Sequence, residues 1–146
     1  MRLSVILERK GRQVHTASPE ETVMDAVHKL VTHNIGALAV VDASGKLAGI
    51  LSERDILRML PREAAELNAI TVAQRMTRNV VTASPADEAA PCLNTMTEHH
   101  IRHLPVCDQG QLSGMVSIGD LVKSQLDDAV FETKHLTAFV TGQYPA

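Results

Sequence analysis

Aromatic residues are scarce in this chain of 146 residues, which has no tryptophan and whose aromatic side chains are Phe131, Phe139 and Tyr144. So few rings cannot form a platform on which bases stack, and a net charge of -3 does not suit a protein that follows a phosphate backbone. Nucleic-acid binding is therefore not expected. Cysteine is scarce as well. Cys92 and Cys107 lack the spacing of a metal or redox pair, so we predict that both are small buried side chains.

Long apolar runs are also missing. The longest covers residues 35–41, and Glu8, Arg9 and Lys10 interrupt the N-terminal segment before it could form the apolar core of a signal peptide. We therefore expect no membrane span and a cytoplasmic protein. With 45% hydrophobic and 21% charged residues, the chain has the composition of one compact folded domain.

The most informative feature that the sequence does contain is a duplicated segment. GILSERD at residues 49–55 is matched by GMVSIGD at residues 114–120, with Gly, Ser and Asp at the same spacing. Each copy predicts a strand that runs into a helix, with the Ser at the N-cap and the Asp in the first turn. Two interpretations follow. The motif can be a variant of the capping box that needs no ligand, or an anion site whose hydroxyl binds phosphate and whose carboxylate binds a ribose.

The duplication extends far beyond this segment. Residues 80–85 mirror 14–19, residues 101–108 mirror 35–42, and residues 110–122 mirror 45–57. Periodicity and turn residues predict the order strand, helix, strand, strand, helix in each copy, and two such half-modules are expected to share one core. We divide the chain into an entry helix and linker (1–13), a first repeat (14–60), a connector whose residues 72–76 echo the entry helix (61–79), a second repeat (80–126) and a C-terminal helical extension (127–146).

Local signals predict where the helices start and stop. Ser18 is expected to cap the first long helix, with Pro19 in its first position and Glu21 completing a capping box. Asn34 is expected to end that helix in the left-handed conformation. Pro91 falls inside the equivalent helix of the second repeat, where a kink is predicted at a cost of roughly 3 kcal/mol unless it is compensated. The apolar face of the first helix is expected to contain Val23, Val27, Leu30 and Val31.

These motifs, in this order and given twice, resemble a tandem pair of CBS domains, also called a Bateman module. The resemblance implies an α+β fold in which two β-α-β-β-α repeats form one pseudo-two-fold module. It also implies a regulatory module, not an enzyme, that binds an adenosine-containing ligand such as AMP, ATP or NAD(H) in the cleft between the repeats. The matching segments are Ile35-Gly36-Ala37-Leu38, Ser52-Glu53-Arg54-Asp55, Arg102-His103-Leu104-Pro105-Val106 and Ser117-Ile118-Gly119-Asp120.

The resemblance also implies roles for individual residues. In the CBS family the Ser and Asp of the duplicated motif meet phosphate and ribose, the threonine strand and the Ile-x-x-Leu strand enclose the base, and basic residues before Leu-Pro-Val meet phosphates. Because Arg102-His103 stands where the first repeat has Gly36-Ala37, we expect two inequivalent pockets. The ligand-binding residues that the resemblance implies are Thr16, Ile35, Ala37, Leu38, Ser52, Arg54, Asp55, Thr82, Ile101, Arg102, His103, Ser117 and Asp120.

Other clusters of reactive side chains do not change this interpretation. His99 and His100 point to different sides of a helix end, and no cysteine or carboxylate joins them and His103 in a metal-binding set. Ser52 and Ser117 have no adjacent base that the sequence fixes, so no catalytic residue is predicted. Two alternatives stay open. One is a structural or oligomerising CBS pair with empty clefts, whose motifs only cap helices, and the other is a nucleotide-using enzyme.

The C-terminal helix, expected from residue 118 to about residue 140, carries more apolar surface than a lone exit helix needs. Packing within the chain and a dimer contact both account for such a face. Because the outer helices of both repeats carry apolar residues on more than one side, we predict a homodimer with two-fold symmetry. The apolar residues of this helix are Leu121, Val122, Leu126, Val130, Leu136, Phe139 and Val140.

Overall fold

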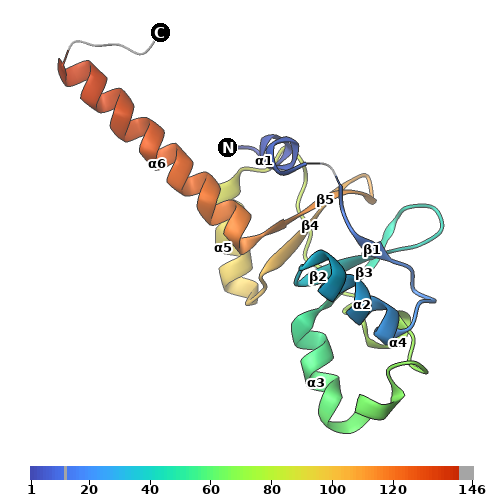
Figure 1. The fold of residues 1–146 in the computed structure, drawn as a ribbon. Coiled ribbons are helices and arrows are strands. Elements are labelled where there is room, and N and C mark those ends of the chain that lie inside the picture. Colours follow the sequence, from blue (N-terminus) through green and yellow to red (C-terminus); the bar gives the residue numbers. More distant parts are fainter. Residues whose placement is uncertain (12, 142–146) are drawn as a thin grey trace.

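The structure, a computed structural model, describes residues 1–11 and 13–141, with side chains up to residue 137. Its mixture of helices and strands confirms the α+β class (Figure 1). In chain order the elements are α1 (Leu3–Lys10), β1 (Thr16–Ala17), α2 (Val23–His33), β2 (Ala37–Val41), β3 (Leu47–Ser52), α3 (Glu53–Glu63), the 3₁₀ helix η1 (Ala64–Glu66), α4 (Val72–Arg75), α5 (Ala89–His99), β4 (His103–Asp108), β5 (Gln111–Ser117) and α6 (Ile118–Thr141).

The two repeats follow the same path through two small sheets. In the first repeat β1 pairs parallel with β2, and β2 forms an antiparallel hairpin with β3. In the second repeat β4 and β5 form the corresponding antiparallel hairpin, and the counterpart of β1 is reduced to a single bridge between Ala83 and Val106. Both hairpins shift register at matching places, between Val40 and Val41 and between Val106 and Cys107. The duplication predicted from the sequence is therefore a duplication of structure.

Among the described residues, the buried side chains form two clusters, one in each repeat, rather than the single shared core that we expected. The backbones of the two repeats are joined at their hairpin turns, where the N–H of Leu47 donates to the carbonyl of Gly110 and that of Leu112 donates to the carbonyl of Gly45. The fully buried large side chains are Val23, Leu38, Val40, Leu51 and Val72 in the first cluster and Leu3, Met96, Leu104, Val106, Val116 and Leu121 in the second.

Each entry helix packs on the repeat that it does not precede. The helix α1 precedes the first repeat but lies on the second, where the N–H groups of Leu3 and Ser4 donate to the carbonyls of Asp87 and Pro85, both at 2.9 Å. The helix α4 precedes the second repeat but lies on the first, where the N–H groups of Val72 and Ala73 donate to the carbonyls of Glu21 and Pro19. The predicted similarity of the segments that contain α1 and α4 is confirmed. That each of these helices packs on the other repeat is a feature that the sequence did not reveal.

This exchange explains why the predicted start of α2 is wrong. The N-cap of α2 is Thr22, which forms a capping box with Asp25, and not Ser18. Ser18 and Glu21 enclose a turn before the helix, and the carbonyls of Pro19 and Glu21 are the acceptors for α4. The apolar face is shifted accordingly, because Val31 is 74% exposed and Ala26 is buried in its place.

The predicted kink at Pro91 is also wrong. Because α5 begins only at Ala89, Pro91 lies in its first turn, where backbone N–H groups have no partner within the helix. In the first repeat, Pro61 lies inside α3. The left-handed stop at Asn34 is confirmed, with a φ of 51°, and His100 ends α5 in the same way.

The helix α6 covers residues 118–141, close to the predicted range, and projects away from the rest of the molecule in Figure 1. Its first turns pack on the second repeat through the fully buried Leu121, whereas Leu126 and Leu136 are exposed. The predicted apolar residues Phe139 and Val140 lie outside the described side chains. Among the described helices, none combines the length and the apolar character needed to cross a membrane.

The duplicated glycine of the Gly-x-x-Ser-x-x-Asp motif leads to a stability prediction. A Cβ atom added at Gly49 would lie 2.6 Å from the Met76 sulfur and 2.7 Å from the Thr77 carbonyl oxygen, and a backbone atom cannot move aside cheaply. Gly49→Ala should lower the free energy of unfolding by about 1 to 3 kcal/mol. Urea unfolding measures this, with Gly119→Ala as the control because its nearest neighbour would be 3.6 Å away. Equal effects of the two substitutions would contradict the prediction.

Candidate functional site

The two Ser-Asp pairs form capping boxes where a strand runs into a helix. At the start of α3 the Asp55 N–H donates to the Ser52 hydroxyl at 3.3 Å, and the Ser52 N–H donates to Asp55 Oδ2 at 2.9 Å. At the start of α6 the same contacts join Asp120 to Ser117 at 3.1 Å and Ser117 to Asp120 Oδ2 at 2.8 Å. The capping geometry predicted for both motifs is therefore confirmed. It does not exclude ligand binding, because each pair lies beside a cleft.

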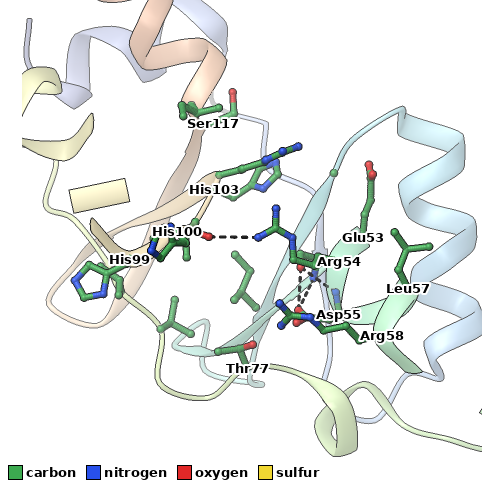
Figure 2. A pocket seen from close by; sticks show the side chains of 18 of the residues that line it. Glu53, Arg54, Asp55, Leu57, Arg58, Thr77, His99, His100, His103 and Ser117 are labelled. Atoms are coloured by element: carbon green, nitrogen blue, oxygen red, sulfur yellow. Dashed lines mark hydrogen bonds between the residues drawn. The ribbon is translucent and has the colours of Figure 1, made fainter. Parts of the chain in front are cut away.

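The first cleft, of about 810 Å³, lies between α3 and the loop between α5 and β4 (Figure 2). Its polar wall carries the box of Ser52 and Asp55, and its apolar wall carries Val80, Val81 and Ile101. In Figure 2 the side chain of Arg54 reaches across the cleft, and its Nη1 donates to the His100 carbonyl at 3.5 Å. The cleft therefore has apolar and hydrogen-bonding surfaces on opposite repeats, which suits a ligand with a flat apolar part and a polar part.

Positive charge prevails on the wall of the first cleft. Arg54, Arg58 and Arg102 line it, whereas its carboxylates are Glu53 and Asp55. Three guanidinium groups, which are always charged and present several donors each, are suited to phosphate. The arrangement favours a ligand that carries negative charge together with hydroxyl groups for Asp55.

The second cleft, of about 440 Å³, lies where the pseudo-two-fold relation would place it. Val14, Ile35 and Ala37 supply its apolar surface, and His15 on its wall stacks on His33 with 3.6 Å between the ring centroids. These positions correspond in the duplicated sequence to those of the first cleft, so the two clefts are equivalent in origin. Their charged residues differ, as the sequence predicted.

His103 lies between the two clefts and, with Gly36 and Ser117, lines both of them. A Cβ atom added at Gly36 would be 3.0 Å from the imidazole, so the wall is closely packed. Burial lowers the pKa of His103 below its ordinary value of 6.5, although Glu53 and Asp120 act in the opposite direction. The imidazole is therefore mostly uncharged at neutral pH.

Lys10, at the end of α1, lies on the wall of the second cleft and pairs with the aspartate of that side. Its ammonium is 2.7 Å from Asp120 Oδ2 and 3.0 Å from the Met115 carbonyl oxygen. Burial alone would raise the pKa of Asp120. The hydrogen bond from Lys10, the bonds from Ser117 and the Lys10 charge together hold this pKa below its ordinary value of 3.8.

The clefts contain most of the predicted ligand-binding residues. Ser52, Arg54, Asp55, Ile101 and Arg102 line the first, Ile35 and Ala37 line the second, and His103 and Ser117 line both. Thr16, Leu38, Thr82 and Asp120 are not among the described residues that line either cleft.

The positions of Leu38 and Asp120 explain why these two residues lie off the walls. Leu38 belongs to the core of the first repeat, since neighbouring residues of a strand point to opposite faces, and Asp120 lies behind Lys10. Sequence reasoning missed the cleft residues Lys10, Val14, Arg58, Val80 and Val81. The matching positions of Val14 and Val80 in the two repeats were a usable signal, whereas nothing local marked Lys10.

Among the residues that the structure describes, no three His, Cys, Asp or Glu side chains come together as a set of metal ligands. Cys92 is buried, as predicted, whereas Cys107 is only partly buried. Burial raises the pKa of both thiols. Neither cysteine lies on a cleft wall.

Comparison with known proteins agrees with this geometry. The family model for the CBS domain matches residues 10–62 and 69–127, which is well over half of the chain. The chain belongs to the CBS-domain family. The resemblance inferred from the duplicated motif is thus confirmed, and the chain is a CBS-domain pair, the type of module that serves regulation.

Relatives and solved structures extend over most of the CBS pair. The chain is 33% identical over 150 residues to the CBS domain-containing protein CBSX3, mitochondrial, of Arabidopsis thaliana, covering 97% of this chain and 73% of that protein. The CBS-domain containing protein ATU1752 from Agrobacterium tumefaciens is 36% identical with a TM-score of 0.80, over 86% of this chain and 99% of that one. The CBS domain pair of protein MJ0100, solved in complex with 5'-methylthioadenosine and S-adenosyl-L-methionine, is 29% identical with a TM-score of 0.77, over 88% and 98%.

The ion pair of Asp120 leads to a pH prediction. A carboxyl group whose pKa is lower in the folded state stabilises the fold above its unfolded pKa, and this contribution is lost as the pH falls through the folded pKa. Asp120→Asn should therefore lower the free energy of unfolding at neutral pH, and its deficit relative to the wild type should narrow as the pH falls below 3.8. Urea unfolding at several pH values measures the free energy of unfolding of the wild type and of the variant. A deficit that stays constant throughout would contradict this origin of the stability.

Proposed function

We propose that this CBS pair senses an adenosine-containing nucleotide, AMP, ATP or NAD(H), and that the first cleft is its principal binding site. The observation that carries the proposal is that Asp55 lies on the same cleft wall as Arg54, Arg58 and Arg102. A carboxylate that accepts hydrogen bonds from a ribose beside three guanidinium groups for phosphates matches the two polar parts of such a ligand. The complex of MJ0100 with two adenosine compounds supports the adenosine part.

The walls suggest how the ligand lies. The base would be held between the aliphatic side chains of Val80, Val81 and Ile101, which replace the stacking aromatics that this chain lacks. The ribose hydroxyls would donate to Asp55, and the phosphates would extend toward Arg102. A phosphate near the largely uncharged His103 would raise the pKa of that imidazole, so binding should be accompanied by proton uptake.

The competing functions are less well supported by the first cleft. A purely structural pair has no need of an open cleft of about 810 Å³ with an excess of positive charge. For an enzyme, Ser52 would be the available nucleophile, but its hydroxyl donates at 3.0 Å to Asp55 within the capping box. The helix cap explains that contact. Among the described groups on the wall, no other side chain pairs with the Ser52 hydroxyl as a base.

Substitution of Asp55 tests the proposal. Asp55→Asn should weaken AMP binding by about 1.5 to 3 kcal/mol, since a hydrogen bond to a charged group is lost. Isothermal titration calorimetry measures the affinity, and melting without ligand measures the effect on the cap.

A matched control for this test is Asp25→Asn. Asp25 caps α2 through the same pair of contacts with Thr22, both at 3.1 Å, and lies outside both clefts. The control should lower the melting temperature without changing the AMP affinity. If Asp55→Asn behaves like Asp25→Asn in both measurements, the motif only caps the helix and the proposal fails.

We further propose that the protein is a homodimer whose contact includes α6. Besides the buried Leu121, this helix carries exposed apolar side chains, among them Val122, Leu126, Val130 and Leu136, and its distal part projects from the module (Figure 1). A helix so exposed is poorly stable by itself, so a partner surface would stabilise it. A second copy in a two-fold arrangement is the commonest way to cover such a face.

The dimer has a direct test. Light scattering at micromolar concentration should give twice the 15.8 kDa mass of one chain, and Leu126→Glu should reduce it to the mass of one chain because a charge would be buried in the contact. Leu121 is unsuitable for this substitution because it is fully buried within the chain. Lys123→Glu is the control, since it changes charge at an exposed polar position. A mass of one chain for the wild type would refute the dimer.

A further inference from the structure

The two clefts differ most in the charge that the segment before each repeat brings to the wall. On the second cleft the segment with α1 brings Lys10, whose ammonium contacts Asp120 Oδ2 at 2.7 Å. On the first cleft the segment after α4 brings Thr77 and Asn79, both uncharged, and Asp55 faces the cleft. Among the described residues, no lysine or arginine forms an ion pair with Asp55. The aspartate that would receive a ribose is thus available in one cleft and paired with a cation in the other.

The position of Lys10 is fixed by the packing of α1. Leu3, Ile6 and Leu7 of this helix are buried in the second repeat, and a Cβ atom added at Gly114 would lie 2.7 Å from the Leu7 side chain. The ammonium also donates to the Met115 carbonyl at 3.0 Å. The packing of α1 therefore holds Lys10 at the second cleft, where its side chain, 39% exposed, pairs with Asp120.

We propose that Lys10 determines the ligand class of the second cleft, which accepts adenosine compounds that carry phosphate and rejects those that do not. This inference rests on the proposed function. A ribose that binds Asp120 must compete with the ammonium, and a ligand without phosphate would leave that ammonium unpaired in a partly enclosed site. A phosphate on the same ligand gives the flexible lysine side chain a new anionic partner within the cleft. The first cleft lacks this requirement.

Two histidines allow each cleft to be observed separately in the full-length protein. His15 lies on the wall of the second cleft and His99 on the wall of the first, so their ring proton signals in NMR spectra report the two sites. We expect AMP to shift both signals, and adenosine to shift that of His99 at concentrations that leave His15 unchanged.

The decisive variant is Lys10→Met, which keeps the aliphatic chain and removes the charge. In the titration followed at His15, Lys10→Met should raise the AMP concentration at the midpoint by about tenfold. It should lower the adenosine concentration at the midpoint, since Asp120 becomes available. Lys10→Arg keeps the charge and should retain the preference for AMP. The matched control is Lys29→Met, because Lys29 forms an equally short ion pair with Glu21 at 2.7 Å and bonds a backbone carbonyl, yet lies on neither wall.

The outcomes separate this inference from the proposed function. If adenosine shifts His15 in the wild type as readily as AMP, or if Lys10→Met changes neither midpoint, Lys10 does not select the ligand, and a normal response at His99 leaves the proposed function standing. If AMP shifts neither histidine in the wild type, both the proposed function and this inference fail. A selective loss of the AMP preference in Lys10→Met, absent in Lys29→Met, would establish the role of Lys10.

Discussion

The close approach of each entry segment to a strand glycine is the constraint on which the arrangement of the two repeats depends. Gly49 faces Met76 and Thr77, which follow α4, and Gly114 faces Leu7 of α1. Any larger side chain at these glycines would push the entry segments away from the sheets. Both glycines lie within strands and admit a neighbouring segment. Gly114 itself lines the second cleft, and both glycines determine which residues stand at the cleft walls.

The same exchange of entry helices produces the difference between the two clefts. Both sides retain the Ser-Asp box, the aliphatic walls and the shared His103, so the duplication alone would yield two equivalent sites. The helix α1 is a turn or more longer than α4, and this additional length carries Lys10 to Asp120. A change in the length of a packed helix, outside the repeats themselves, is thus enough to give two sites of common origin different electrostatics.

The features that the sequence predicted depend on short-range patterns. The hairpins, the left-handed stop at Asn34 and both Ser-Asp boxes follow from periodicity, turn residues and the repeat itself. The aliphatic wall residues Ile35 and Ile101 were implied by the family resemblance. The starts of α2 and α5 could not be predicted from such short-range patterns. The backbone carbonyls of Pro19 and Pro85 accept hydrogen bonds from α4 and α1, which lie far away in the chain. Lys10 could not be predicted for the same reason, since no local signal says which repeat α1 will join.

The exchanged helices also impose an order on folding during synthesis. The first repeat is complete when α4 has been made, because that helix supplies its missing contacts soon after the repeat ends. The helix α1 is synthesised before both repeats but finds its partners only when the segment from Pro85 to Gly114 has left the ribosome. Its apolar face, with Leu3, Ile6 and Leu7, therefore stays uncovered while the first repeat and most of the second are made.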